Sequence, residues 1–270
     1  MSAGGSADGA AAGAVNSLHL LIMDIVGGLV CIYLSGFIGE IGSVIAGIGA
    51  VLAIVWGSDA IRRVASYGLG TGVPSIGYMS LSVGVISSLA GISLATILKL
   101  NILGPVLALV FAIIIGAIIA IVATKIVGMK IPIMLQCTIE IAGAASLSIL
   151  AFATAIAGSY EMTAIYNNVV ASGFIAVLFI LCTMAIQHPF NACLGPNEDQ
   201  LRTLKCAAST AFLSMTLVGI LSSITGGMGW AIVLVVGLIG WIISFRAFVN
   251  ASCNYAASTR WAGLWPKVEE

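Results

Sequence analysis

The sequence predicts an all-α membrane protein in which residues 1–270 form one integral-membrane domain. Of the 270 residues, 60% are hydrophobic and 7% are charged, and the mean hydropathy is +1.17. A soluble domain carries about 25% charged residues because its surface meets water, and this chain lacks the side chains for such a surface. Since about 20 apolar residues cross a bilayer as a helix, the length accommodates roughly eight crossings with short loops. We therefore expect a multi-pass protein of the cell membrane.

Eight apolar runs mark the predicted spans, and the joints between them alternate between short and long. The two long joints, at residues 58–75 and 188–205, follow the second and the sixth run. Because short and long joints alternate, the two faces of the bundle differ. The predicted spans are Leu18–Ile38, Ile41–Gly57, Ile76–Leu98, Ile102–Thr124, Ile131–Ala157, Thr163–Gln187, Cys206–Ile224 and Trp230–Val249.

The basic residues orient the predicted bundle, because Lys and Arg are retained on the cytoplasmic side of short loops. With eight spans, nine of the ten basic residues fall on one face, and Lys99 alone falls on the other. We therefore expect both termini and both long joints, as loops, to be cytoplasmic. The nine residues are Arg62, Arg63, Lys125, Lys130, Arg202, Lys205, Arg246, Arg260 and Lys267.

The two ends of the chain differ in composition. Residues 1–17 are rich in Gly, Ala and Ser and contain no basic residue, which predicts a short flexible tail rather than a signal peptide. Residues 250–270 contain Trp261, Leu264 and Trp265 among basic residues. This composition is typical of an anchor at the membrane interface, and a surface that docks on a partner protein is the alternative.

A pattern of repetition relates the two halves of the chain. Asp24-Ile-Val-Gly-Gly resembles Glu140-Ile-Ala-Gly-Ala, and each half has an acidic outer hairpin, at Glu40 and at Glu161. Four spans return the chain to the same face, so such halves would form a 4+4 parallel repeat of the sort found in transporters. Chance matching of Ala- and Gly-rich helices is the alternative.

The motifs exclude several classes of site. Charged residues occur singly or in small groups between apolar runs, so no basic face follows a nucleic-acid backbone. The six cysteines include no CxxC pair, which fits neither a zinc nor an iron–sulfur site. Gly68, Gly70 and Gly72 lack the strand and the G-K-[ST] of a phosphate loop, and His188 and Cys193 lack a third ligand at metal spacing. We expect no complete active site in this chain.

Two acidic residues fall inside predicted spans, where an ionised side chain costs about 2.5–3.5 kcal/mol at the helix centre. Glu140 lies roughly 13 Å into its span and Asp24 roughly 9 Å, and neither has a basic partner in its own span. A sodium ion, a proton, a water-filled vestibule or a base from another helix would each satisfy such an acid. A neutral carboxyl group that is hydrogen-bonded between helices is the alternative.

Three further charged residues lie near the ends of predicted spans. Glu40 and Glu161 are at the outer ends, where they would form a hydrated vestibule for ions, and the alternative is that they are solvated turn residues. Arg246 is close to the end of the eighth span. Its long side chain would reach the cytoplasmic interface by snorkelling, so it needs no buried partner.

Two loop strings resemble a known family. Tyr67-Gly-Leu-Gly-Thr-Gly-Val-Pro-Ser-Ile-Gly77 and His188-Pro-Phe-Asn-Ala-Cys-Leu-Gly-Pro-Asn-Glu198, together with the Gly- and Ala-rich tail, resemble the integral-membrane C subunit of tetrahydromethanopterin S-methyltransferase from methanogenic archaea. The resemblance covers essentially the whole chain. It implies membership of a translocase complex of methanogenesis. That complex moves a methyl group from methyl-tetrahydromethanopterin through a corrinoid to coenzyme M and couples the transfer to sodium-ion export.

The resemblance also implies a division of labour. The corrinoid and the methyl-transfer site would reside on other subunits, membrane subunits D and E would be neighbours within the lipid bilayer, and this chain would bind no organic cofactor. Sodium prefers carboxylate and carbonyl oxygens, which Glu140, Asp24 and glycine-exposed backbone can supply. A purely structural scaffold and a stand-alone secondary ion transporter are the alternatives.

Overall fold

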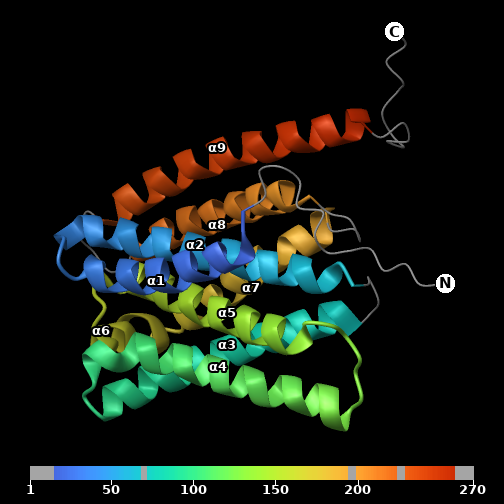
Figure 1. Cartoon of the computed structure of the whole chain (residues 1–270). Helices are drawn as coiled ribbons and strands as arrows, with labels where there is room; N and C mark the ends of the chain where they lie inside the picture. The colour runs from blue at the N-terminus through green and yellow to red at the C-terminus, as the bar shows by residue number, and fades with distance from the viewer. Residues whose placement is uncertain (1–14, 68–71, 194–198, 224–228, 259–270) are drawn as a thin grey trace.

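The fold is a bundle of helices that run nearly side by side (Figure 1). A computed structural model describes residues 15–67, 72–193, 199–223 and 229–258, and no strand occurs among them. The α-helices are α1 (Ser17–Ser35), α2 (Gly42–Ala65), α3 (Gly72–Ile97), α4 (Gly104–Ile121), α5 (Met134–Ala157), α6 (Met162–Ile165), α7 (Phe174–Cys193), α8 (Gln200–Ser222) and α9 (Gly229–Ser258). Short 3₁₀ segments are η1 (Gly39–Ile41) and η2 (Asn101–Leu103), and π-helical segments are η3 (Val122–Ile126) and η4 (Tyr166–Val170). The all-α prediction is confirmed.

The predicted number of spans agrees with the structure when one broken helix is counted once. Seven described helices are long and apolar enough to cross a membrane, and a bent pair brings the number to eight. This pair consists of Met162–Val170 and Phe174–Pro189, which meet at 91°. The sequence predicted one continuous span there. The break falls at Gly173, whose φ of +83° belongs to the left-handed region and interrupts the helix.

Helix α5 forms the centre of the bundle, in contact with α1, α2, α3, α4, α7 and α8. In its most apolar window, 94% of the residues are buried. Small side chains allow this, because in lipid helices associate through close backbone approach rather than through a hydrophobic drive. A Cβ at Gly84 of α3 would lie only 2.5 Å from the Ala142 oxygen. Nearby, the Ser88 hydroxyl donates to Ser146 Oγ at 3.1 Å.

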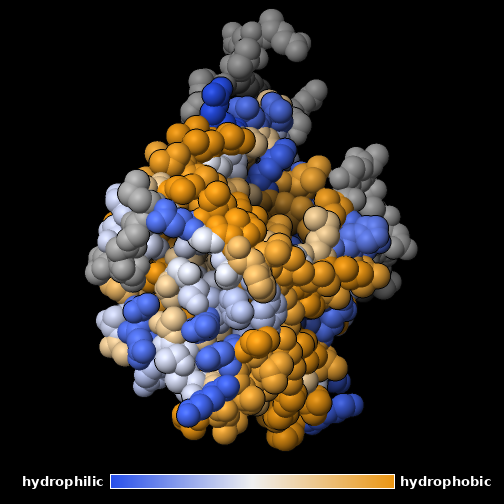
Figure 2. Space-filling view, turned by 90° about the vertical axis from the view of Figure 1, so that its left-hand side faces the viewer, coloured by the Kyte–Doolittle hydropathy of each residue, from blue (hydrophilic) through white to orange (hydrophobic). Residues whose placement is uncertain are grey.

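The helices at the edge of the bundle expose apolar side chains. Only 22% of the most apolar window of α1 and 17% of that of α9 are buried. Figure 2 looks onto the end of the bundle where α2 begins. Hydrophilic and weakly polar side chains cover much of that end face, and hydrophobic side chains line its right-hand side and top. Apolar flanks around a more polar end are expected of a bundle that spans a bilayer.

The structure corrects both predicted long loops. Helix α2 continues to Ala65 and α3 begins at Gly72, so much of 58–75 is helical. Helix α7 continues to Cys193 and α8 begins at Gln200, so much of 188–205 is helical too. Charged residues led to the errors in α2 and α8, because they ended the apolar runs but not the helices. In α7 the apolar run ended at His188 and Pro189, and Pro189 lies inside the helix. Asp199 shows why α8 starts early: its side chain accepts hydrogen bonds from the Leu201 and Arg202 amides as an N-cap.

The predicted tails also change. Helix α1 begins at Ser17, capped by Asn16, and α9 extends to Ser258. The extension of α9 places Arg246 well inside the helix. The prediction that Arg246 lies close to a helix end was therefore wrong. Residues 1–14 of the predicted tail lie outside the described residues. The same holds for the aromatic part of the C-terminal tail, Trp261, Leu264 and Trp265.

The basic residues gather at one end of the bundle, as their one-sided distribution predicts. Helix α1 starts and α9 finishes at this end, on the right in Figure 1. We call it the basic end; its described residues are Arg62, Arg63, Lys125, Lys130, Arg202 and Lys205. We call the opposite end, which carries Glu40, Glu161 and Lys99, the acidic end. The 4+4 repeat stays a prediction. Of the helices that begin its two halves, α1 lies at the edge of the bundle and α5 lies at its centre.

Candidate functional site

Buried charged side chains form a cluster at the basic end, where α2 meets α1, α5 and α8. Asp59 of α2 is 0% exposed, and both of its carboxylate oxygens accept hydrogen bonds. Oδ1 accepts from Arg62 Nε at 3.1 Å and from Gln200 Nε2 at 3.1 Å. Oδ2 accepts from Arg63 Nε at 3.1 Å and from the Ser17 hydroxyl at 3.2 Å. Asp59 therefore joins three helices through a single carboxylate.

Glu140 of α5 belongs to the same cluster. Its carboxylate forms an ion pair with the Arg63 guanidinium, which donates to both carboxylate oxygens. Oε2 also accepts from Trp56 Nε1 at 3.0 Å, and Oε1 accepts from Gln136 Nε2 at 2.8 Å. Arg63 thus bridges Asp59 of its own helix and Glu140 of the neighbouring helix.

The cluster is balanced in charge, because two carboxylates face two guanidinium groups. All four carboxylate oxygens are occupied by donors, so the cluster holds the helices together and offers no open carboxylate oxygen to a cation. Removing one partner from a buried ion pair costs about 3–5 kcal/mol, since the other charge is left uncompensated. We name this set, Asp59, Arg62, Arg63 and Glu140, the ion-pair cluster.

The structure shows which group compensates Glu140 and changes its distance from the start of its helix. A base from another helix, one of the alternatives left open, compensates its charge. Its depth also differs, because α5 begins at Met134 rather than at Ile131. Glu140 then lies roughly 9 Å from the start of its helix. Its position relative to the bilayer midplane stays a prediction.

Asp24 is the buried acid that lacks such compensation. Along α1 the buried residues Leu20, Asp24, Gly28 and Ile32 recur every four positions and form one inward stripe. Asp24 is 1% exposed, and its Oδ2 has no hydrogen-bond partner among the described residues. Asp59, the nearby charged group, carries a charge of the same sign and acts on it electrostatically. The side chain lies roughly 10 Å further along α1 than Ser17, beyond the ion-pair cluster.

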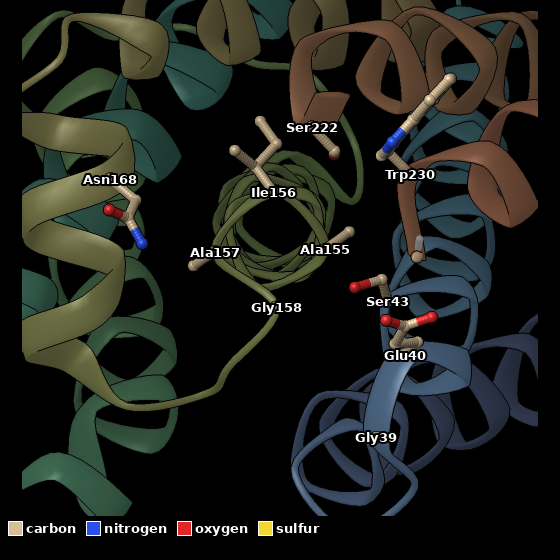
Figure 3. A pocket seen from close by; sticks show the side chains of 11 residues that line it. Gly39, Glu40, Ser43, Ala155, Ile156, Ala157, Gly158, Asn168, Ser222 and Trp230 are labelled. Atoms are coloured by element: carbon tan, nitrogen blue, oxygen red, sulfur yellow. The ribbon is translucent and has the colours of Figure 1, made fainter. Parts of the chain in front are cut away.

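The other two predicted acids lie at the acidic end and are exposed. Glu161 precedes α6 as its N-cap residue, and its backbone N–H donates to the Ser159 hydroxyl at 3.1 Å. Glu40 lies in η1 and lines a pocket of about 320 Å³ around the C-terminal end of α5 (Figure 3). The structure thus brings neither residue together with Glu140 or Asp24. No group of three or more His, Cys, Asp or Glu that would hold a metal ion occurs among the described residues.

Sequence reasoning missed most of the ion-pair cluster. Asp59 and Arg63 were assigned to a loop, although Arg62 and Arg63 follow Asp59 at the i+3 and i+4 spacing of helical ion pairs. That spacing, together with the apolar residues between and after them, was the available signal. The link to Glu140 had no local signal, because Arg63 lies 77 positions away in the chain.

The fold and these sites define a polytopic α-helical membrane protein whose buried acids are held in two different ways. Comparisons with known proteins identify the family to which it belongs. The family model for the C subunit of tetrahydromethanopterin S-methyltransferase matches residues 1–269. The chain belongs to this family, which confirms the resemblance found in the two loop strings.

Relatives from several methanogens carry the same name. The chain is similar to the tetrahydromethanopterin S-methyltransferase C subunit of Methanothermobacter thermautotrophicus, with 56% identity over 98% of each chain. It is 48% identical to that of Methanosarcina mazei, over 100% of this chain and 99% of the relative. With that of Methanococcus maripaludis strain C5, identity is 37% over 89% of this chain and 90% of the relative. The chain is thus one of the subunits of a methyltransferase complex of methanogenesis.

Proposed function

We propose that this chain contributes an ion path to a complex that transfers a methyl group from methyl-tetrahydromethanopterin to coenzyme M and exports sodium ions. Family membership supports the methyltransferase part of this proposal. The observation that carries the ion path is Asp24, a buried carboxyl group with an oxygen that has no partner in the described part of the chain. A side chain of this kind within a membrane helix either stays neutral or holds a cation.

Asp24 suits a transient ion site better than Glu140 does. A sodium ion at Glu140 would compete with the Arg63 guanidinium for both carboxylate oxygens, whereas no described residue donates to Oδ2 of Asp24. Sodium is a hard cation that prefers oxygen ligands. The proposed role of Glu140 is accordingly to position α2 and α5, and the proposed ion ligand is Asp24.

We also propose an orientation and a division of labour. The basic end would face the cytoplasm, because Lys and Arg are retained there. Its helix ends would meet the subunits that hold the corrinoid and perform the methyl transfer. Membrane subunits D and E would cover the exposed apolar sides of α1 and α9, with lipid filling the remainder. The chain itself would hold no organic cofactor.

A purely structural scaffold is the second candidate function, and the ion-pair cluster favours it. Its carboxylates are fully engaged by donors from α1, α2, α5 and α8, as expected of groups that fix helix positions. A transporter that works alone is disfavoured, because the family is defined as one subunit of an enzyme. Ion flux by the isolated chain in liposomes would reverse that judgement.

Sodium export by the reconstituted complex tests the proposal. In proteoliposomes, methyl transfer to coenzyme M and accumulation of sodium are measured together in the wild type and in the Asp24→Asn variant. Asn has nearly the same shape but no charge, so we expect methyl transfer to persist at high sodium while sodium accumulation falls at least fivefold. Glu161→Gln, an exposed acid, is the matched control. Unchanged export per methyl group in Asp24→Asn would support the scaffold instead.

A further inference from the structure

Helix α4 has small side chains on its inside and large ones on its outside. It lies at the edge of the bundle opposite α9 (Figure 1), and with η2 and η3 it forms the most apolar of the described candidate spans. Its buried residues include small side chains that recur every four positions, Ala108, Ala112, Gly116 and Ala120. Its exposed residues are all branched aliphatics, and we call them the α4 face: Ile102, Leu103, Val106, Val110, Ile113, Ile114, Ile118, Ile121 and Val122.

The composition of the α4 face favours acyl chains over a partner helix. Helices in lipid associate where Gly, Ala, Ser and Thr let their backbones approach closely, and α4 uses such residues for its inner contacts. A Cβ on Gly91 of α3 would lie 2.5 Å from the Ala108 Cβ. The α4 face contains none of these small residues. Branched side chains hold a second helix at a distance, whereas flexible acyl chains fill the space between them.

The length of the α4 face matches the hydrocarbon core of a bilayer. From Ile102 to Val122 the chain rises about 30 Å at 1.5 Å per residue, and the hydrocarbon core is about 30 Å thick. Lys99 lies three positions before this face, and Lys125 lies three positions after it. Both lysines are exposed, and so is Lys130 beyond them at the basic end. Their long side chains therefore reach the level of the lipid headgroups by snorkelling.

No acidic side chain balances these lysines. Between Asp59 and Glu140 the chain contains no Asp or Glu. Within the described residues, salt bridges involve Arg62 and Arg63 of the ion-pair cluster and none of the three lysines. An ammonium group that lies beside an apolar face and has no acidic partner is complementary to an anionic lipid phosphate.

The backbone at Lys99 supports a role for that side chain. Lys99 follows α3 with a φ of +57°, the left-handed region in which Gly is the usual residue. Its amide donates to the Thr96 carbonyl at 3.3 Å, and the Leu100 amide donates to the Ala95 carbonyl at 2.8 Å. These two bonds form a Schellman motif, in which Gly would adopt the same φ without strain. A ligand for the ammonium group accounts for a lysine at this position.

We propose that the α4 face binds phospholipids whose anionic headgroups meet Lys99 in one leaflet and Lys125 and Lys130 in the other. The acyl chains lie along the branched side chains between these two levels. Helix α4 is then the lipid side of this subunit, opposite the side at α9 that is proposed for partner subunits. The binding of lipid does not depend on the proposed ion path through Asp24.

Quenching by brominated lipids tests this proposal. The intact complex is placed in phosphatidylcholine nanodiscs with a bimane fluorophore on Val106→Cys or on Ile121→Cys, and the complex without the introduced cysteine serves as the blank. Brominated phosphatidylglycerol, which is anionic, is compared with brominated phosphatidylcholine at the same low mole fraction. We expect both lipids to quench both labels. Phosphatidylglycerol should quench at least about twice as strongly, because the lysines concentrate it at the α4 face.

The two ends of the α4 face should respond separately. Lys99→Gln should abolish the preference for phosphatidylglycerol at the Val106 label and preserve it at the Ile121 label. The double variant Lys125→Gln with Lys130→Gln should do the reverse. Co-purification of the other subunits checks that each variant assembles. Neither variant should lower the temperature at which the detergent-purified complex dissociates, because the lysines hold lipid rather than a neighbouring helix.

Arg246→Gln is the matched control, because Arg246 is an exposed basic residue on α9, at the opposite edge of the bundle. It should change neither preference. A loss of preference equal to that in Lys99→Gln would overturn the proposal, since the total charge of the complex would then explain the response. Equal quenching by the two lipids in the wild type would overturn it too. So would an absence of quenching by either lipid, which would indicate that another membrane subunit covers α4.

Discussion

The two ends of the bundle hold their acidic side chains in opposite ways. At the basic end, Asp59 and Glu140 are buried, and every carboxylate oxygen accepts from a donor. At the acidic end, Glu40 and Glu161 are exposed, and Glu40 lines a pocket without basic residues among its described lining. The difference shows that the depth of an acid in a membrane bundle does not decide its role. The role depends instead on which donor group the fold places next to the acid.

Asp24 lies between these two situations. It is buried as deeply as the acids of the basic end, yet its Oδ2 has no donor within the ranges that the structure describes. Predictions that separate the two ends, and Asp24 from Glu140, therefore test the account directly.

The largest expected effect concerns which end faces the cytoplasm. In a cysteine-free background, a membrane-impermeant maleimide should label Lys99→Cys in intact cells and leave Ser66→Cys unlabelled, because the basic residues orient the basic end inward. Permeabilised cells serve as the control in which both positions react. Labelling of Ser66→Cys in intact cells would reverse the orientation and remove the proposed cytoplasmic role of the basic end.

The next effect concerns the ion-pair cluster. Arg63→Gln leaves Glu140 without its cation and Asp59 with one fewer, so the complex should lose about 3–5 kcal/mol of stability. The temperature at which the purified complex dissociates measures this loss. Lys99→Gln, an exposed basic residue at the other end, is the matched control and should have no measurable effect. The double variant Arg63→Gln with Glu140→Gln should recover part of the loss, because it removes the uncompensated charge. Equal behaviour of Arg63→Gln and Lys99→Gln would contradict the cluster.

A smaller effect tests the close packing of α3 against the central helix α5. Gly84→Val places a side chain against the Ala142 oxygen and the Ala145 Cβ, each 2.5 Å from an added Cβ. Overpacking of this kind costs about 1–3 kcal/mol. Ile86→Val, at a position on the same helix that is 60% exposed, should leave the dissociation temperature unchanged. A neutral Gly84→Val variant would show that α3 and α5 are not in close contact in the complex.

The sequence predicted the number of spans and the clustering of basic residues because both depend on local composition. Apolar runs of about 20 residues identify helices that cross a membrane, and the one-sided distribution of Lys and Arg follows from counting. The end of α2 was predicted too early because charges in a helix resemble charges in a loop, and the end of α7 because Pro189 lies inside the helix. Asp59, Arg62 and Arg63 continue α2 through helical ion pairs. Neither Asp59 nor its neighbours interrupt the helix.

The candidate site was predictable only in part. Glu140 and Asp24 were identified because an acid in an apolar run is conspicuous in the sequence. Their surroundings differ because Arg63, 77 positions away in the sequence, forms an ion pair with Glu140 and not with Asp24. The pocket at the acidic end depends on where η1, α5, η4 and α9 meet. A contact between segments so far apart in the chain leaves no signal in the local sequence.

The sodium dependence of methyl transfer most directly tests the central claim, that Asp24 meets the ion while Glu140 is held by Arg63. The rate of methyl transfer to coenzyme M is measured against sodium concentration in the wild type, Asp24→Asn and Glu140→Gln complexes. The account predicts that Asp24→Asn raises the half-saturating sodium concentration at least about tenfold, or about 1.4 kcal/mol. Glu140→Gln should change it less than twofold in the complex that still assembles. A tenfold rise in Glu140→Gln with no change in Asp24→Asn would contradict the account.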